Sequence, residues 1–193
     1  MKHRTVLLFG APGSGKGTQG RILGTIPGFF HCSCGEVFRS LRPDTELGRI
    51  FVQYSSQGRL VPDEPTVELW RQYIASCERT GRYHPDTDFL VLDGIPRNVR
   101  QAELLRDTLD VRVVIHLTCP DRDQLVQRLQ RRALRENRLD DANLEVIRDR
   151  LRTYEQETRP VLDFYGPARR CEVNAAQPPL AVLQDVLKIL STL

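Results

Sequence analysis

The sequence predicts an α/β fold in which a five-stranded parallel sheet lies between two layers of helices. Short apolar runs alternate with longer amphipathic stretches, as expected when each strand is followed by a crossover helix. A glycine-rich segment comes directly after the first apolar run, where folds of this kind bind phosphate. The length of 193 residues suits one such domain with small insertions.

The strands are expected where apolar runs rich in branched and aromatic residues are bounded by polar or turn residues. In chain order they are residues 5–9, 29–32, 89–93, 111–117 and 170–173. Helices are expected where apolar positions recur every three to four residues. In chain order they are residues 16–25, 35–41, 46–57, 64–80, 99–108, 122–135, 144–165 and 180–190.

The segment 144–165 is predicted as one long amphipathic helix. Ile147, Leu151 and Val161 fall on one face at helical spacing, so this face should pack on the core. Pro160 stands inside the pattern and is expected to bend the helix.

Residues 10–18 read Gly-Ala-Pro-Gly-Ser-Gly-Lys-Gly-Thr. The four glycines allow the backbone to curl until its N–H groups converge, and together with the start of the next helix they form a phosphate site. Lys16 adds a full positive charge there. It is one of only three lysines among the 28 basic residues, which argues against an ordinary surface charge. The common phosphate loop has Ser or Thr directly after the lysine, whereas this chain has Gly17 and then Thr18.

A second motif, Asp-Gly-Ile-Pro-Arg, ends the apolar run of residues 89–92. In an open parallel sheet the ligand lies at the carboxyl ends of the strands, so Asp93 should lie beside the phosphates. There its carboxylate would bind Mg²⁺ directly or through water. Gly94 and Pro96 form a tight turn, and Arg97 should emerge at the same edge of the sheet.

Arginines are concentrated between residues 128 and 150, in the segments Arg-Leu-Gln-Arg-Arg, Arg-Leu-Asp-Asp and Arg-Asp-Arg. By themselves they are typical either of a solvated helix face or of a phosphate clamp. Elsewhere acidic and basic residues are interleaved, and the net charge is only +3. This balance does not indicate nucleic-acid binding.

Bulk features also favour a cytoplasmic protein. No apolar run approaches the ~20 residues that cross a bilayer, and the first residues lack the apolar segment of a signal peptide. The five cysteines have no regular spacing, which predicts reduced thiols. Cys32 and Cys34 lie too close together, with no second pair, to predict a zinc site.

The loop ending Gly-Lys-Gly-Thr, followed by Asp-Gly-Ile-Pro-Arg and Arg-Leu-Asp-Asp, resembles the nucleoside monophosphate kinases, and among them most closely the adenylate kinases. The motifs occur in order from residue 6 to residue 174. The resemblance implies a P-loop NTPase-like three-layer α/β/α fold. It also implies reversible phosphoryl transfer from ATP to AMP that gives two ADP, with Mg²⁺ accompanying ATP.

Site residues follow from the resemblance position by position. Those implied in ATP binding are Gly13, Ser14, Gly15, Lys16, Gly17, Thr18, Arg128, Arg132 and Gln177. Those implied in AMP binding are Cys34, Arg39, Arg59, Leu60, Val61, Gly94, Ile95, Pro96, Arg97, Gln101, Arg138 and Arg150. Those implied in the transfer itself are Lys16, Arg97, Arg132, Arg138 and Arg150, with Asp93 at the metal.

The resemblance also implies a single kinase domain, residues 1–193, with two mobile parts. The core is residues 1–32, 62–130 and 142–193; residues 33–61 form an inserted monophosphate-binding region and residues 131–141 a short lid. The longer lid of many bacterial members is absent, and with it their zinc-binding cysteines, so no structural zinc is expected. The short lid and the lack of an obvious apolar patch favour a monomer. The expected partners are small nucleotides, namely ATP, AMP and ADP, with neither nucleic acid nor membrane.

The acceptor base is open to two interpretations. Gln101 favours AMP, because a carboxamide can accept from the amino group of adenine and donate to a ring nitrogen. Three departures from the adenylate kinase pattern work against this. Cys34 stands where Thr is expected, and Glu36 and Asn98 replace the common Asp and Thr with residues that also occur in UMP/CMP kinases.

Two further alternatives remain open in the sequence. A non-catalytic nucleotide-binding module would share the glycine loop, although the intact Lys16, Asp93 and Arg97 favour an enzyme. The segment after Asp141 is one residue longer than usual, so either Arg150 or Arg148 supplies the clamp, and we favour Arg150.

Overall fold

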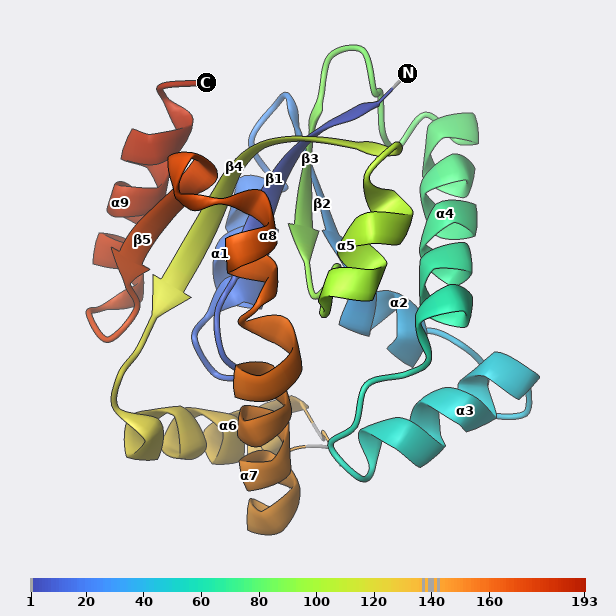
Figure 1. Ribbon diagram of the computed structural model, residues 1–193, viewed down its shortest axis with the longest axis vertical. Helices are drawn as coiled ribbons and strands as arrows, with labels where there is room; N and C mark the ends of the chain where they lie inside the picture. The colour runs from blue at the N-terminus through green and yellow to red at the C-terminus, as the bar shows by residue number, and fades with distance from the viewer. Residues whose placement is uncertain (1, 137, 139–140, 142) are drawn as a thin grey trace.

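The computed structural model describes residues 2–136, 138, 141 and 143–193. Its five strands form one parallel sheet in the order β2-β3-β1-β4-β5, which confirms the predicted fold class (Figure 1). Each strand was expected within a few residues of its observed bounds. These are β1 His3–Phe9, β2 Phe29–Ser33, β3 Phe89–Asp93, β4 Leu109–Thr118 and β5 Arg170–Asn174.

Helices cover both faces of the sheet (Figure 1). Their bounds are α1 Lys16–Leu23, α2 Cys34–Arg39, α3 Glu46–Ser55, α4 Asp63–Arg79, α5 Val99–Leu105, α6 Arg122–Glu136, α7 Leu144–Thr153, α8 Val161–Tyr165 and α9 Pro179–Leu190. Within the described part of the chain, no helix is both long enough and apolar enough to span a bilayer.

Alternating side chains of the central strands separate two apolar clusters, one on each face of the sheet. Leu7 and Phe9 of β1 pack in the cluster that includes residues of α4, α5 and α8. Val6 and Leu8 point to the other face and pack with Leu23 of α1 and with α9. Because successive side chains of a strand point to opposite faces, this alternation produces the three layers.

The prediction of one continuous helix over residues 144–165 is wrong. The structure has α7, then a π-helical turn over Tyr154–Thr158, and then the short helix α8. In the turn the Arg159 N–H bonds to the Tyr154 carbonyl at 2.9 Å. Pro160 follows; it has no N–H and its ring crowds the preceding turn, so the regular α-helical pattern cannot continue through it. The expected apolar face is present in both α7 and α8, where Ile147 and Val161 are fully buried.

The strands all end at the edge of the sheet where the arginine-rich α6 and α7 and the helices α2 and α3 lie (Figure 1). The glycine loop follows β1, α2 follows β2, and the turn at Gly94 follows β3. Parallel strands thus bring segments that are distant in the sequence to one edge.

Candidate active site

A cavity of about 590 Å³ opens at the carboxyl ends of the strands. It is lined by every residue that the sequence predicted for the site except Ile95. The side chain of Ile95 is 1% exposed and packs in the core, whereas its neighbours Gly94 and Pro96 line the cavity.

The glycine loop forms the floor of the cavity between β1 and α1. Gly10, Gly13 and Gly15 have φ values of 146°, 85° and 99°, a backbone region that side chains disfavour. A Cβ at Gly10 would also lie 2.6 Å from the Leu117 carbonyl oxygen. Gly17 differs from the expectation that all four glycines curl the loop, because it lies inside α1.

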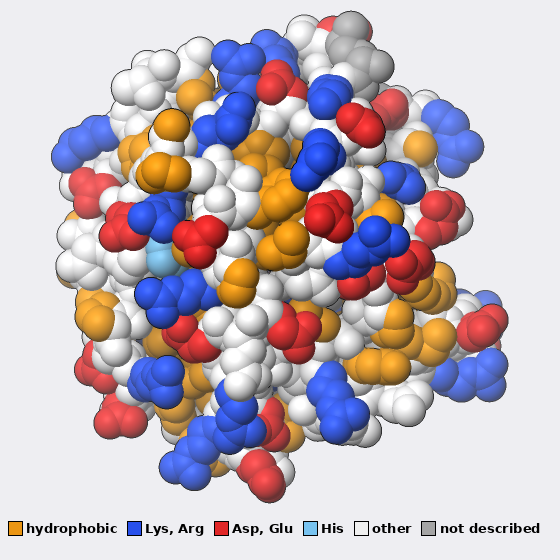
Figure 2. Space-filling view, in the orientation of Figure 1, with side chains coloured by type: hydrophobic (Ala, Val, Ile, Leu, Met, Phe, Trp, Pro, Cys, Tyr) orange, Lys and Arg blue, Asp and Glu red, His pale blue; other side chains and the backbone are white. Residues whose placement is uncertain are grey.

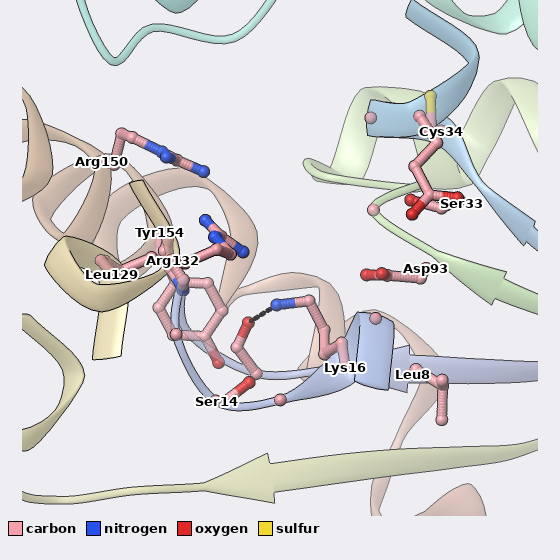
Figure 3. Close-up of a pocket in the computed structure, with 18 of the residues that line it drawn as sticks. Leu8, Ser14, Lys16, Ser33, Cys34, Asp93, Leu129, Arg132, Arg150 and Tyr154 are labelled. Carbon is pink, nitrogen blue, oxygen red and sulfur yellow. Dashed lines mark hydrogen bonds between the residues drawn. The ribbon is translucent and has the colours of Figure 1, made fainter. Parts of the chain in front are cut away.

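Lys16 projects from the first turn of α1 back over the loop (Figure 3). Its ammonium donates to the carbonyls of Gly10 at 2.7 Å and Ala11 at 3.2 Å. Burial lowers the pKa of Lys16 to about 8; Asp93 opposes this shift, while nearby arginines add to it. The negative charge near the ammonium group is therefore too small to offset its desolvation and the repulsion from the arginines. This is expected of a site that binds phosphate.

Asp93 ends β3 and faces the cavity opposite Lys16 (Figure 3). It is 9% exposed, and a Cβ at Gly17 would lie 3.5 Å from its carboxylate. A carboxylate beside a phosphate-binding loop is the hard oxygen ligand that Mg²⁺ prefers, so this position fits the metal. Among the residues that the structure describes, no cluster of three or more His, Cys, Asp or Glu side chains is arranged to hold a metal.

Arginines from α6 and α7 face Lys16 and Asp93 across the cavity (Figure 3). Arg132, Arg138 and Arg150 converge on Asp141, whose side chain is fully buried. Arg132 Nε donates to an Asp141 oxygen at 2.7 Å, and Arg150 pairs with the other oxygen. One buried carboxylate thus holds three guanidinium groups beside the cavity.

The structure separates the two candidates for the clamp. Arg150 lines the cavity, whereas Arg148 is exposed on α7 and does not. Arg138 is described, but its neighbours 137, 139 and 140 in the expected lid lie outside the described residues.

The opposite wall comes from α2, the segment after α3, and the turn after β3. Cys34 is 4% exposed, and burial raises the pKa of its thiol to about 11, so the thiol is protonated at neutral pH. Arg97 Nε donates to the Gly94 carbonyl at 2.9 Å. The remaining residues of this wall that the sequence predicted are Arg39, Arg59, Leu60, Val61 and Gln101.

A third group of predicted residues lies near the end of β5. Arg128 donates to the carbonyl of Ala175 at 2.8 Å, and Gln177 Nε2 donates to Asp185 at 2.7 Å. Arg128 and Gln177 both line the cavity, so α6 and the loop after β5 share this part of its wall.

Several cavity residues were not predicted from the sequence. Arg131 and Arg135 of α6 and Tyr154 of the π turn line the cavity, and Asp141 organises the arginines. The available signal for Asp141 was its place in Arg-Leu-Asp-Asp, where an acidic residue follows a run of arginines. Nothing in the sequence marked Tyr154 beyond its apolar spacing.

Comparisons with known proteins agree with this geometry. The family model described as adenylate kinase matches residues 8–169. An adenylate kinase of Porphyromonas gingivalis is 40% identical over 166 residues, which cover 83% of this chain and 81% of that protein. Adenylate kinases of Bacteroides thetaiotaomicron and Thermobifida fusca are 37% and 36% identical, and each alignment covers 97% of this chain and 98% of the relative.

The phosphate-binding loop, the parallel sheet and the arginine-lined cavity define a P-loop phosphotransferase. More particularly, the chain belongs to the adenylate kinase family, whose enzymes transfer a phosphoryl group between ATP and AMP.

Proposed function

We propose that this cavity binds ATP and AMP together and transfers the γ-phosphoryl group between them, giving two ADP. The observation that carries the proposal is the concentration of cations in one cavity. Eleven cationic side chains and three carboxylates line it among the described residues. Such an excess suits two phosphate chains that would otherwise repel each other.

On the donor side, the ATP phosphates would lie in the loop from Gly13 to Thr18, against its N–H groups and Lys16. The free backbone amides at the start of α1 and the positive end of its dipole support this placement. The donor adenine would lie between Arg128 and the backbone near Gln177, which share one part of the wall.

On the acceptor side, the phosphate of AMP would bind Arg39 and Arg97, with Arg138 and Arg150 approaching from the lid side. The residues that complete this pocket would be Cys34, Arg59, Leu60, Val61, Gly94, Ile95, Pro96 and Gln101. Gln101 would read the adenine through its carboxamide.

The chemistry needs positioning and charge neutralisation more than it needs a strong base, since the attacking phosphate oxygen is already anionic near neutral pH. Arg97, Arg132, Arg138 and Arg150 with Lys16 surround the space where the phosphoryl group would move. Mg²⁺ held near Asp93, directly or through water, would neutralise charge on the ATP phosphates when bound.

Water must be kept from the transferring group. We infer that residues 33–61 close over AMP and residues 131–141 over ATP, while residues 1–32, 62–130 and 142–193 form the core. The described parts of both segments line the same cavity, which supports this division. We further infer that the protein acts as a cytoplasmic monomer on nucleotides alone, without a structural zinc ion.

Steady-state rates with Mg²⁺, ATP and each of AMP, CMP, UMP and GMP test the proposal. We expect kcat/KM to be highest for AMP, with ADP as the product of both substrates. A higher kcat/KM for CMP or UMP would assign the chain to pyrimidine nucleotides. Nucleotide binding without any ADP formation would make it a binding module.

A further inference from the structure

The carboxamide of Gln101 is held at both ends. The residue is 1% exposed, yet it lines the cavity. Its Nε2 donates to Asp63 Oδ1 at 2.8 Å, and its Oε1 accepts the Arg97 N–H at 2.8 Å. Asp63 is 38 positions away in the sequence and begins α4.

These two partners allow only one orientation of the amide. A carboxylate oxygen has no proton to donate, and a backbone N–H cannot accept. If the amide were turned over, Oε1 would face the Asp63 oxygen and Nε2 would face the Arg97 N–H. The amide would lose both hydrogen bonds, and its oxygen would lie against the negatively charged Asp63 oxygen, which is costly.

Asp63 is itself fixed by a third side chain. Asn98 Nδ2 donates to the same Asp63 oxygen at 2.7 Å. The other end of the Asn98 amide accepts the Gln101 N–H at 2.8 Å and caps α5. The network therefore joins the first residue of α4 to the first turn of α5, and Gln101 has little freedom to turn.

The network leaves Gln101 with half of its hydrogen-bonding capacity. An amide has two N–H donors and two oxygen lone pairs, and one of each is used internally. One donor and one acceptor remain for a ligand. Their complement is a base edge with an amino group beside an unprotonated ring nitrogen, which adenine and cytosine possess. At the positions of adenine N6 and cytosine N4, guanine, uracil and hypoxanthine carry a carbonyl oxygen in place of the amino group.

We propose that Asp63, acting through Gln101, makes the acceptor site select nucleoside monophosphates with an amino-bearing base edge and reject those with a keto edge. This inference rests on the proposed function, in which the acceptor base lies beside Gln101. Asp63 is a positioning residue: it fixes which end of the amide accepts and does not touch the base. Asn98, unusual for the family pattern, supports Asp63 in this role.

A comparison of AMP with inosine monophosphate tests the proposal. Inosine monophosphate has a carbonyl where AMP has an amino group, and the purine is otherwise nearly unchanged. For the wild-type protein we expect kcat/KM for AMP to exceed that for inosine monophosphate by about 100-fold, the upper range for a bidentate base contact. Asp63→Leu removes the acceptor at similar size and should shrink this ratio by about tenfold or more, as expected when Gln101 is freed to turn. Asp63→Ser should shrink it too, since a hydroxyl both donates and accepts.

Two further variants separate orientation from simple structural damage. Asp63→Asn keeps an acceptor oxygen, and the Asn98 Nδ2 donor holds that oxygen in place beside Gln101, so this variant should retain most of the selectivity. Glu64→Leu makes the same change at the neighbouring acid, which is exposed and absent from the cavity wall, and should leave the ratio unchanged. Structural damage would lower the rates with AMP and inosine monophosphate together and leave their ratio intact.

The proposal is overturned if an active Asp63→Leu or Asp63→Ser protein keeps the wild-type ratio. It is also overturned, without any variant, if the wild-type protein uses inosine monophosphate as well as AMP. A separate result would contradict the proposed function, namely a higher kcat/KM for CMP than for AMP. In that case the comparison of CMP with UMP still tests whether the amide selects the amino edge.

Discussion

Lys16 is a partly buried cation with other cations around it. Burial is the main cause of its lowered pKa of about 8, and Arg97, Arg132 and Arg150 add to the effect against the single opposing charge of Asp93. In the absence of nucleotide this charge works against the folded state. The negative charge of bound phosphates would stabilise the Lys16 ammonium group. The residue whose charge lowers the stability of the free protein is thus well placed to bind the substrate.

The lowered pKa of Lys16 should make the free energy of unfolding depend on pH. Between a folded pKa of about 8 and the ordinary value of 10.5, the unfolded chain keeps a proton that the folded chain has lost, so stability rises with pH. We expect the wild-type protein to gain stability relative to Lys16→Met as the pH is raised from about 7 to about 10, as measured by urea unfolding without nucleotide. Lys16→Met should also lose turnover by orders of magnitude.

Lys188→Met is the matched control, because that lysine is exposed on α9 and outside the cavity. Its stability should follow the wild-type protein across the same pH range. Equal pH dependence of the Lys16→Met and wild-type proteins would contradict the assigned environment of Lys16.

At the scale of the elements, α1 packs on β2 through a glycine. A Cβ at Gly20 would lie 2.3 Å from Nε2 of His31, so the helix approaches the strand more closely than a side chain allows. The ring of His31 fills that space, and burial lowers its pKa. This contact fixes the helix that begins at the phosphate loop against the strand that leads to the acceptor wall.

Gly20→Ala should therefore destabilise the protein by about 1–3 kcal/mol through overpacking, despite the better helix propensity of alanine. A double-mutant cycle with His31→Ala provides the check. Once the ring is absent, Gly20→Ala should become neutral or stabilising, as measured by chemical unfolding. A destabilisation of the same size in both backgrounds would show that the cost arises elsewhere.

At the scale of the whole molecule, charge is distributed unevenly between the surface and the cavity. The net charge is only +3, and on the face seen in Figure 2 basic and acidic side chains are interspersed. The cavity, by contrast, is lined by ten arginines and Lys16 with only three carboxylates among the described residues. The field that attracts a polyanion is therefore focused at the site instead of being spread over the surface.

Nucleotide capture should accordingly depend on salt. As ionic strength rises from about 0.01 M to about 0.15 M, the Debye length falls from about 30 Å to about 8 Å. We expect kcat/KM to fall by about tenfold or more over this range, with a smaller change in kcat. Arg135→Gln in the cavity wall should reduce this dependence, whereas Arg112→Gln, exposed on β4 and outside the wall, should not. Equal salt dependence of both variants would contradict focusing by the cavity.

Much of the site could be predicted because its signals are local. The glycine loop needs particular backbone angles, and Asp93 ends a buried strand, so both can be predicted from neighbouring residues. The interruption at Tyr154–Thr158 was not predicted as a π turn. A proline shows that regular hydrogen bonding stops, but the packing around it decides how the chain continues.

The parallel α/β fold, the phosphate loop and the supply of arginines can be predicted from short stretches of sequence, because hydrophobic periodicity and special backbone requirements are encoded locally. Which arginines face the site depends on how the helices pack. Arg148 and Arg150 differ by about 200° around a helix, so the packing of α7 turns one inward and the other outward. The tertiary structure likewise brought Asp63 to Gln101, and Asp141 to Arg132 and Arg150, because charged groups and amides that are separated in the sequence find their partners through the fold.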